Sequence, residues 1–134
     1  MKASKARVLL TGASGGIGQA MASALHQAGA AVMGVGRGDA PAHMAWARAD
    51  LTRDEGVAAV TAAADDWGAN VLVHAAGVPA FGSLHSARPV QMQAALKANL
   101  LAPMRLTQAM LPALLRQPRA QVVFVGSALG RIGL

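Results

Sequence analysis

The 134-residue sequence lacks cysteine altogether and has few aromatic and few charged residues. Without cysteine the chain cannot form disulfide bonds or use a thiolate nucleophile, which suits a reducing compartment, so we expect a cytoplasmic protein. No apolar run approaches the roughly 20 residues that cross a bilayer. The apolar stretch after the basic N-terminus is too short for a secretory signal. The sequence therefore predicts neither a membrane-spanning segment nor an export signal.

The formal net charge of +6 raises the question of a nucleic-acid partner. The twelve Lys and Arg residues are scattered from Lys2 to Arg131, with no basic run and no interleaved aromatic residues on which bases could stack. We therefore expect neither nucleic acid nor membrane as a partner, and we predict no metal site. The basic residues are interpreted as a solvated surface that suits an anionic ligand.

Short apolar runs alternate with stretches of helical periodicity. Strands are predicted over Arg7–Leu10, Ala30–Val35, Ala45–Ala49, Val71–His74 and Gln121–Val125. Helices are predicted from Ile17 to Ala28, from the capping-box pattern Thr52–Glu55 through Trp67, and from Pro89 to Arg116 with interruptions at Asn99 and Pro103. Short, wholly apolar strands that alternate with helices predict a parallel sheet covered on both faces, in a single α/β domain over residues 1–134.

The strongest local signal is the stretch TGASGGIG at residues 11–18, between the first strand and the first helix. One glycine permits a tight turn, another admits backbone N–H groups to a pyrophosphate, and Gly18 lets the helix pack against the sheet. Because the turn directly follows a strand and opens a periodic helix, it predicts a nucleotide site rather than a turn without a ligand. The residues expected to form this site are Gly12, Ser14, Gly15, Gly16, Ile17 and Gly18.

This turn resembles that of the short-chain dehydrogenase/reductase family, and further segments match the family in the same order. ADL at residues 49–51 matches an Asp that faces the adenine amino group, and HAAG at 74–77 matches an Asn-Asn-Ala-Gly segment. NLLAP at 99–103 matches a helical Asn, and GSALG at 126–130 matches the catalytic serine turn. The resemblance implies a Rossmann-like, doubly wound parallel sheet of about five strands in the order 3-2-1-4-5.

The resemblance also implies cofactor contacts beyond the glycine turn. These contacts are expected at Asp50, Leu51, Ala75, Ala76 and Gly77. The chain departs from the family pattern where His74 and Ala75 stand in place of two asparagines, which removes one polar tie beside the cofactor. We interpret His74 as a structural residue at the end of a strand rather than as a catalytic one.

The choice of cofactor depends on the end of the second strand, which reads Val35-Gly36-Arg37. In dinucleotide folds an acid about 20 residues beyond the glycines binds the ribose 2′-hydroxyl of NAD, whereas an Arg accepts the 2′-phosphate of NADP. Gly36 stands at the acidic position and Arg37 offers a charged fork for phosphate, so NADP is favoured. NAD is the alternative, because a shift of two residues would place Asp39 on the ribose.

The resemblance implies hydride transfer between NADP(H) and a carbonyl or alcohol substrate. Ser127 would orient the substrate oxygen, and Asn99 would hold a water of the proton relay. The family's proton donor is a Tyr followed four residues later by a Lys, and this chain contains no tyrosine. We therefore expect the chain to be the N-terminal part of such an enzyme, inactive by itself and lacking later strands, helices and the substrate loop. The complete protein is expected to be a homo-oligomer.

Two other functions are compatible with a glycine-rich turn. One is a non-catalytic dinucleotide-binding module that keeps the cofactor turn without the catalytic segment. The other is an S-adenosylmethionine-dependent methyltransferase, against which the matches at Asp50, Asn99 and Ser127 argue. The substrate is not readable from the sequence, although Phe81, Leu84 and Leu129 are candidates for the border of its pocket.

Overall fold

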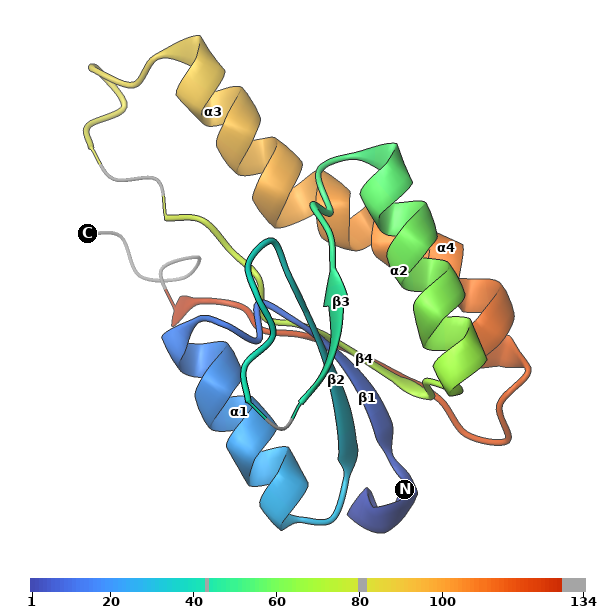
Figure 1. The fold of residues 1–134 in the computed structure, drawn as a ribbon. Coiled ribbons are helices and arrows are strands. Elements are labelled where there is room, and N and C mark those ends of the chain that lie inside the picture. The colour runs from blue at the N-terminus through green and yellow to red at the C-terminus, as the bar shows by residue number, and fades with distance from the viewer. Residues whose placement is uncertain (43, 80–81, 129–134) are drawn as a thin grey trace.

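A computed structural model of the chain describes residues 1–42, 44–79 and 82–128 (Figure 1). In this part of the chain, five strands form one sheet: β1 (Arg7–Thr11), β2 (Ala31–Gly36), β3 (Ala45–Arg48), β4 (Val71–His74) and β5 (Gln121–Phe124). Their order is β3-β2-β1-β4-β5, as the sequence predicted, and every neighbouring pair is parallel. The order reverses between β1 and β4, and ligands of such sheets bind at that crevice, beyond the carboxyl ends of the strands.

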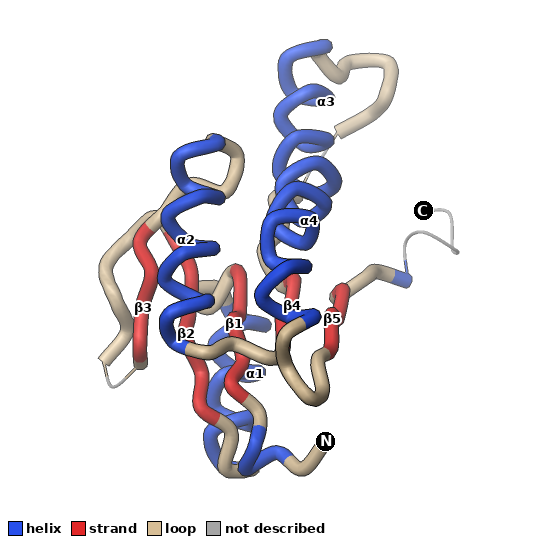
Figure 2. The backbone as a smooth tube through the Cα atoms, turned by 90° about the vertical axis from the view of Figure 1, so that its right-hand side faces the viewer, coloured by secondary structure: helices blue, strands red, loops and turns tan. Residues whose placement is uncertain are grey.

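Helices cover both faces of this sheet (Figures 1 and 2). The helical elements are η1 (Ala3–Lys5), α1 (Gly16–Gln27), α2 (Asp54–Trp67), α3 (Pro89–Leu96), η2 (Lys97–Leu101) and α4 (Ala102–Leu115). Because side chains alternate along a strand, Leu9 packs into the core under α2 and α4, whereas Val8 and Leu10 pack into a second core under α1. The chain is thus a three-layer α/β structure, and α3 extends beyond the sheet (Figure 1).

Glycine ends two of the helices. Gly29 and Gly68 follow α1 and α2 with φ angles of 89° and 77°, in the left-handed region that glycine adopts without strain. After α1, the Ala30 N–H donates to the Leu25 carbonyl at 2.9 Å and so uses a carbonyl that the helix leaves unpaired. Each turn returns the chain directly to the sheet.

The capping box expected at the start of α2 is absent. Arg53 occupies the N-cap and makes no side-chain cap hydrogen bond, so the prediction that Thr52 caps the helix is wrong. Thr52 instead donates hydrogen bonds to Asp50, which leads its side chain away from the helix N-terminus. An acidic residue two positions before a Thr competes for its donors through a local Asx turn.

The long helical segment is continuous where interruptions were predicted. Between α3 and α4 the chain runs through the π-helical turn η2, in which the Ala102 N–H bonds to the Lys97 carbonyl. Pro103 has no N–H to offer the Asn99 carbonyl, which is a physical reason for a wider turn here. The sequence thus indicated the position of the irregularity, whereas the helix axis continues through it.

The predicted strand boundaries differ from the observed ones by one residue at several ends. The N–H of Ala49 still bonds to the Gly36 carbonyl, and the N–H of Val125 still bonds to the His74 carbonyl, just past the ends of β3 and β5.

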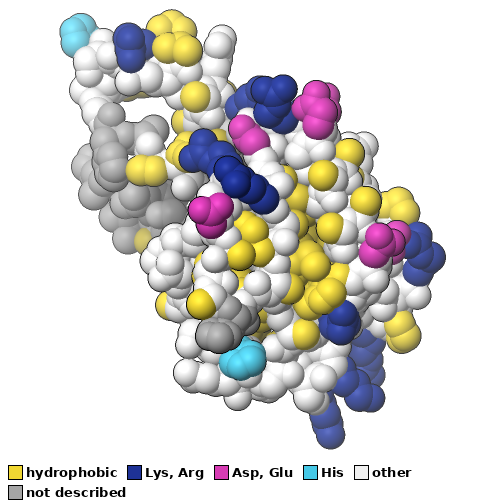
Figure 3. Space-filling view, viewed as in Figure 1, with side chains coloured by type: hydrophobic (Ala, Val, Ile, Leu, Met, Phe, Trp, Pro, Cys, Tyr) yellow, Lys and Arg dark blue, Asp and Glu magenta, His cyan; other side chains and the backbone are white. Residues whose placement is uncertain are grey.

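On the face shown in Figure 3, Lys and Arg side chains lie in separate groups, some of them beside acidic side chains. No helix in the described part of the chain is long and apolar enough to span a membrane.

Candidate cofactor site

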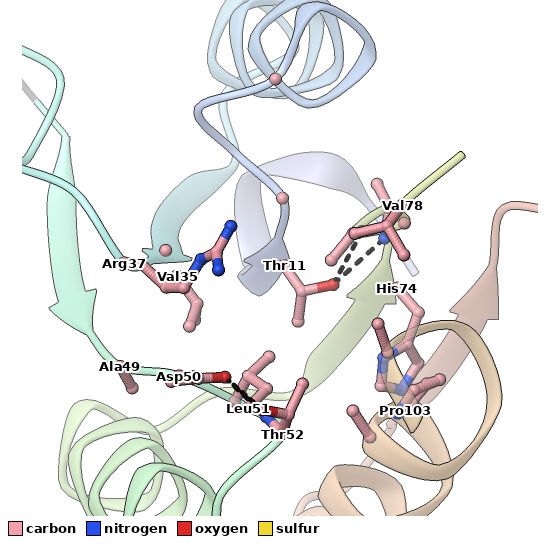
Figure 4. Close-up of a pocket in the computed structure, with 18 of the residues that line it drawn as sticks. Thr11, Val35, Arg37, Ala49, Asp50, Leu51, Thr52, His74, Val78 and Pro103 are labelled. Atoms are coloured by element: carbon pink, nitrogen blue, oxygen red, sulfur yellow. Dashed lines mark hydrogen bonds between the residues drawn. The ribbon is translucent and has the colours of Figure 1, made fainter. Parts of the chain in front are cut away.

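A pocket of about 330 Å³ lies beyond the carboxyl ends of the central strands (Figure 4). Most residues predicted to bind the cofactor line it: Gly12, Ser14, Gly15, Arg37, Asp50, Leu51, Ala75, Ala76 and Gly77. The pocket also has lining residues that were not among the predicted contacts: Thr11, Val35, Gly36, Ala49, Thr52, His74, Val78, Ala98, Ala102 and Pro103. Motifs far apart in the sequence therefore meet at one cavity at the switch point of the sheet.

Thr11 and Gly12 hold the segment after β4 against the end of β1. The Thr11 Oγ1 atom accepts hydrogen bonds from the backbone N–H groups of Ala75 at 3.2 Å and Ala76 at 3.1 Å (Figure 4). Gly12 has a φ of 70°, and a Cβ built on it would lie 2.7 Å from the backbone N and Cα of Ala76. Only glycine fits there, because the two backbones approach too closely for any side chain.

The other glycines of the turn differ in what surrounds them. A Cβ on Gly18 would lie 2.0 Å from the Gly12 carbonyl oxygen, so the first turn of α1 presses directly on the glycine turn. A Cβ on Gly16 would meet no heavy atom within 4 Å, and the side chain of Ile17 is exposed. Gly16, Ile17 and Gly18 form the first turn of α1 and are not among the described residues that line the pocket.

Asp50, in the segment that follows β3, also lines the pocket. Its Oδ1 atom accepts hydrogen bonds from the Thr52 hydroxyl at 2.7 Å and the Thr52 N–H at 2.9 Å. These bonds lower the pKa of Asp50. Desolvation opposes them in part, and the positive charges of Arg37 and Arg53 add to the lowering. Asp50 is therefore an ionised acceptor whose direction is fixed by Thr52.

Gly56 was not predicted to matter for this side of the pocket, yet it places α2 against Asp50. A Cβ on Gly56 would lie 2.0 Å from the Asp50 carbonyl oxygen, which no real side chain could tolerate. The available signal was a glycine inside an otherwise helical run, which usually has a packing reason. Gly56 thus allows the first turn of α2 to support the backbone of the Asp50 segment.

The end of β2 places a positive charge in the pocket. Arg37 is a lining residue, and Figure 4 shows it on the side opposite His74. Asp39 points elsewhere, because its carboxylate pairs with Arg48 at 3.4 Å and its side chain is 97% exposed. Of the two residues considered for the choice of cofactor, Arg37 lines the pocket, whereas Asp39 does not.

His74 is buried at the end of β4 and lines the same pocket. Its Nε2 atom is hydrogen-bonded to the Thr107 hydroxyl at 2.8 Å, and its ring stacks on Phe124 with centroids 4.7 Å apart. Burial lowers the pKa of His74 to about 4, because desolvation disfavours the charged imidazolium. The imidazole is therefore neutral at physiological pH.

Asn99 and Ser127, the predicted catalytic residues, are not among the described residues that line the pocket. Both polar groups of the Asn99 side-chain amide bond to the backbone of Val78. The Oδ1 atom accepts from the Val78 N–H at 2.8 Å, and the Nδ2 atom donates to the Val78 carbonyl at 2.9 Å. Asn99 therefore reaches the pocket through Val78, which does line it. Ser127 is exposed in the segment after β5, at the same edge of the sheet.

The predicted border of the substrate pocket is only partly visible. Phe81 and Leu129 lie outside the described residues, as do residues 129–130 of the serine turn. Leu84 is described and is 82% exposed.

Within the described ranges, no three His, Cys, Asp or Glu side chains gather as they would around a metal ion.

The residues of the pocket fit a dinucleotide. Gly12, Ser14 and Gly15 line the cavity beside the N-terminus of α1, which favours negative charge, and Arg37 adds a cation. Asp50 supplies an acceptor for a hydrogen-bond donor such as an amino group. These groups suit the phosphates and the base of such a ligand.

Comparisons with known proteins agree with this fit. A family model described as short chain dehydrogenase matches residues 6–134. The chain is 29% identical over 136 residues to the 3-oxoacyl-(acyl-carrier-protein) reductase FabG of Vibrio cholerae. This match covers 93% of this chain and 56% of that protein. It is also 29% identical over 147 residues to dehydrogenase/reductase SDR family member 7B of Bos taurus, covering 95% of this chain and 45% of that protein.

Solved structures with the same fold include a short-chain dehydrogenase from Streptomyces avermitilis, with a TM-score of 0.87, 28% identity, and coverage of 96% of this chain and 51% of that one. An actinorhodin polyketide ketoreductase determined with NADPH has a TM-score of 0.88 at 25% identity and covers 98% of this chain and 57% of that one. The chain spans about half the length of the curated relatives it matches. Because the family model matches nearly every residue, the chain belongs to the short-chain dehydrogenase family.

Proposed function

We propose that this protein is an oxidoreductase that transfers a hydride between NADP(H) and a carbonyl or alcohol substrate. The family supports the reaction class, since its members named above are reductases and dehydrogenases. The observation that carries the choice of NADP is Arg37, which lines the pocket while Asp39 pairs with Arg48 outside it. A ketoreductase of similar fold was determined with NADPH.

In this proposal each side of the pocket has a separate task. The Gly12–Gly16 backbone and the start of α1 hold the pyrophosphate, Arg37 and Ser14 hold the 2′-phosphate, and Asp50 accepts from the adenine amino group. The bound cofactor supplies the hydride for a carbonyl carbon, and the carbonyl oxygen takes up one proton. The segment Ala75–Gly77, held by Thr11, forms the wall on the nicotinamide side.

The proton must come from a group other than those described in the pocket. His74 is the nearest candidate, but the burial that lowers its pKa to about 4 leaves it neutral and without an acidic proton at pH 7. Ser127 is proposed to orient the substrate oxygen, and Asn99 to fix the pocket wall and the proton relay. Residues 1–134 contain no tyrosine, so we expect this segment by itself to bind cofactor without turnover.

Titration of NADPH and NADH against the full-length protein tests the cofactor. Arg37→Ala should weaken NADPH binding by about 1.5–3 kcal/mol, the contribution of one charged hydrogen-bonding contact, and leave NADH binding nearly unchanged. Arg53→Ala is the matched control, since Arg53 carries the same charge near Asp50 but is not among the described lining residues. Equal losses for both cofactors would refute the role of Arg37.

A non-catalytic dinucleotide-binding module is the second candidate, because the two asparagines of the family pattern are replaced here by His74 and Ala75. Assay of the full-length protein with NADPH and a panel of carbonyl compounds separates the two functions. Cofactor binding without turnover of any compound would favour the module, whereas reduction of one compound class establishes the enzyme.

We also propose that the complete protein assembles as a homo-oligomer in the cytoplasm. Several large apolar side chains of α3, η2 and α4 are exposed, including Leu100, Met104 and Leu115. Burying such a surface against a second copy is favourable, whereas leaving it in water is costly. Light scattering after gel filtration measures the mass in solution, and fractionation of cells expressing the protein tests the compartment.

A further inference from the structure

The indole of Trp46 lies over the end of β2 on the face of the sheet that α1 covers. Trp46 belongs to β3, where it pairs with Gly34, and it packs against the core cluster under α1. A Cβ on Gly34 would lie 2.6 Å from the Trp46 Cζ3 atom, and a Cβ on Gly36 would lie 2.7 Å from its Cζ2 atom. The ring therefore fills the space in which side chains at both positions would begin.

Gly36 is the position from which an acidic side chain would reach the ribose of NAD. The clash involves a bulky, partly buried ring that packs against the core cluster under α1, so it cannot be relieved by turning a flexible chain end. Trp46 thus excludes an acidic residue at position 36 by volume. A carboxylate there would also repel a 2′-phosphate, so its exclusion favours NADP.

Trp46 also ties down the backbone on the far side of Arg37. Its Nε1–H donates to the Gly38 carbonyl at 3.0 Å, and the ring contacts the Gly36 position. Arg37 lies between these two glycines, which have no side chains of their own to fix the segment. One tryptophan therefore constrains the residue on each side of the arginine that lines the pocket.

We propose that Trp46 is a specificity-determining residue for the cofactor: its ring excludes an acid at position 36, and its indole N–H fixes the Gly36–Gly38 segment so that Arg37 faces the 2′-phosphate. This inference rests on the proposed preference for NADP. A tryptophan with a purely structural role would change stability, but it would not change the ratio of the NADPH and NADH dissociation constants.

The steric part is tested by thermal unfolding of the full-length protein without cofactor, in a cycle of Gly36→Asp, Trp46→Val and the double variant. We expect Gly36→Asp to lower the melting temperature strongly in the parent and much less in the Trp46→Val background. Equal losses in both backgrounds would show that Trp46 does not exclude the side chain. This measurement does not depend on which cofactor the protein uses.

The specificity part is tested by fluorescence titration of NADPH and NADH. Trp46→Phe keeps a ring but loses the bond to Gly38, and we expect it to weaken NADPH binding by roughly threefold to tenfold while NADH binding changes little. The double variant should shift the ratio toward NADH by about tenfold or more. The introduced carboxylate can accept a hydrogen bond from the ribose of NADH, whereas it repels the 2′-phosphate of NADPH. Trp67→Phe, at the far end of α2, is the matched control and should leave the ratio unchanged.

The outcomes separate this inference from the proposed function. A parent protein that binds NADH as tightly as NADPH would refute the NADP preference, whereas the unfolding cycle would still decide the steric role. With a parent that prefers NADPH, a Trp46→Phe variant that weakens both cofactors equally overturns the positioning role. A double variant with the parent ratio overturns the role in specificity.

Discussion

The side-chain amide of Asn99 pairs with both backbone polar groups of Val78. Its Oδ1 atom accepts from the Val78 N–H at 2.8 Å, and its Nδ2 atom donates to the Val78 carbonyl at 2.9 Å. A Cβ on the preceding Gly77 would already lie 3.4 Å from the Asn99 Oδ1 atom. The π-helical turn thereby holds the pocket wall that follows β4, and Asn99 acts as a positioning residue there.

This pairing predicts the effect of Asn99→Asp. The carboxylate can still accept from the Val78 N–H, but its second oxygen would face the Val78 carbonyl, so the pair of bonds becomes one bond and one repulsion. We expect the free energy of unfolding to fall by about 1 kcal/mol, since water can reach this exposed site. Cofactor affinity, measured by titration of the full-length protein, should fall as well.

Asn70→Asp is the matched control for that experiment. Asn70 also uses both ends of its amide, accepting from the Arg7 N–H at 2.9 Å and donating to the Lys5 carbonyl at 2.9 Å, but at the amino end of the sheet. It should lower stability to a similar extent without changing cofactor affinity. A loss of affinity as large as that of Asn99→Asp would refute a local role for Asn99.

Gly16 and Gly18 are predicted to separate cofactor binding from folding. Gly16→Val should leave the melting temperature nearly unchanged, because its Cβ meets no heavy atom within 4 Å, and should abolish cofactor binding by blocking approach to the helix N-terminus. Gly18→Val should unfold the turn, because its Cβ would lie 2.0 Å from the Gly12 carbonyl oxygen. Circular dichroism and cofactor titration measure both effects. A Gly16→Val variant that binds normally would disprove the phosphate cradle.

Gly56→Ala is predicted to disturb the Asp50 side of the pocket. The added Cβ would lie 2.0 Å from the Asp50 carbonyl oxygen, so α2 or the Asp50 backbone must shift, at a cost of about 1–3 kcal/mol. Ala62→Gly, at an exposed position of the same helix, costs about 1 kcal/mol through helix propensity alone. Unfolding in urea and cofactor titration distinguish the two, because only Gly56→Ala should weaken binding beyond its effect on stability.

Much of this fold could be predicted from the sequence because its signals are local and agree with one another. The apolar runs of β1 and β4 are too short for helices, and Gly29 and Gly68 end α1 and α2 in a conformation that other residues adopt with strain. The glycine turn is local in part: Gly18 is required by the Gly12 carbonyl oxygen within the turn and Gly12 by its own φ of 70°, whereas the close approach of Ala76 to Gly12 comes from the distant segment after β4.

Most of the features that escaped prediction depend on contacts between residues far apart in the sequence, and one depends on a competing local acceptor. Thr52 had the local pattern of a helix cap, but Asp50 offered it a closer acceptor. Asn99 was assigned to a water relay by resemblance, whereas its bonds to Val78 depend on how the helix crosses the segment after β4. Trp46 had no motif at all, and its contact with Gly36 depends on the pairing of β2 with β3.

The buried imidazole of His74 predicts a loss of stability in mild acid. Burial lowers the pKa of His74 in the folded protein from 6.5 to about 4, whereas the unfolded chain titrates near the unperturbed value. Between these two values the unfolded state binds more protons than the folded state, so the free energy of unfolding falls as the pH decreases from about 6.5 toward 4. Well above pH 6.5 both states are neutral at this residue, and it makes no pH-dependent contribution there.

Urea unfolding of the full-length protein from about pH 7.5 down to about pH 5 tests this, in a range above that in which carboxylates such as Asp50 take up protons. His74→Gln keeps a polar group toward Thr107 but cannot titrate, so its stability should fall less over this interval than that of the parent. His85→Gln removes an exposed histidine and should leave the slope of the parent unchanged. A His74→Gln variant with the full slope of the parent would show that the imidazole is not held neutral by burial, and would return His74 to consideration as a proton-transfer group of the pocket.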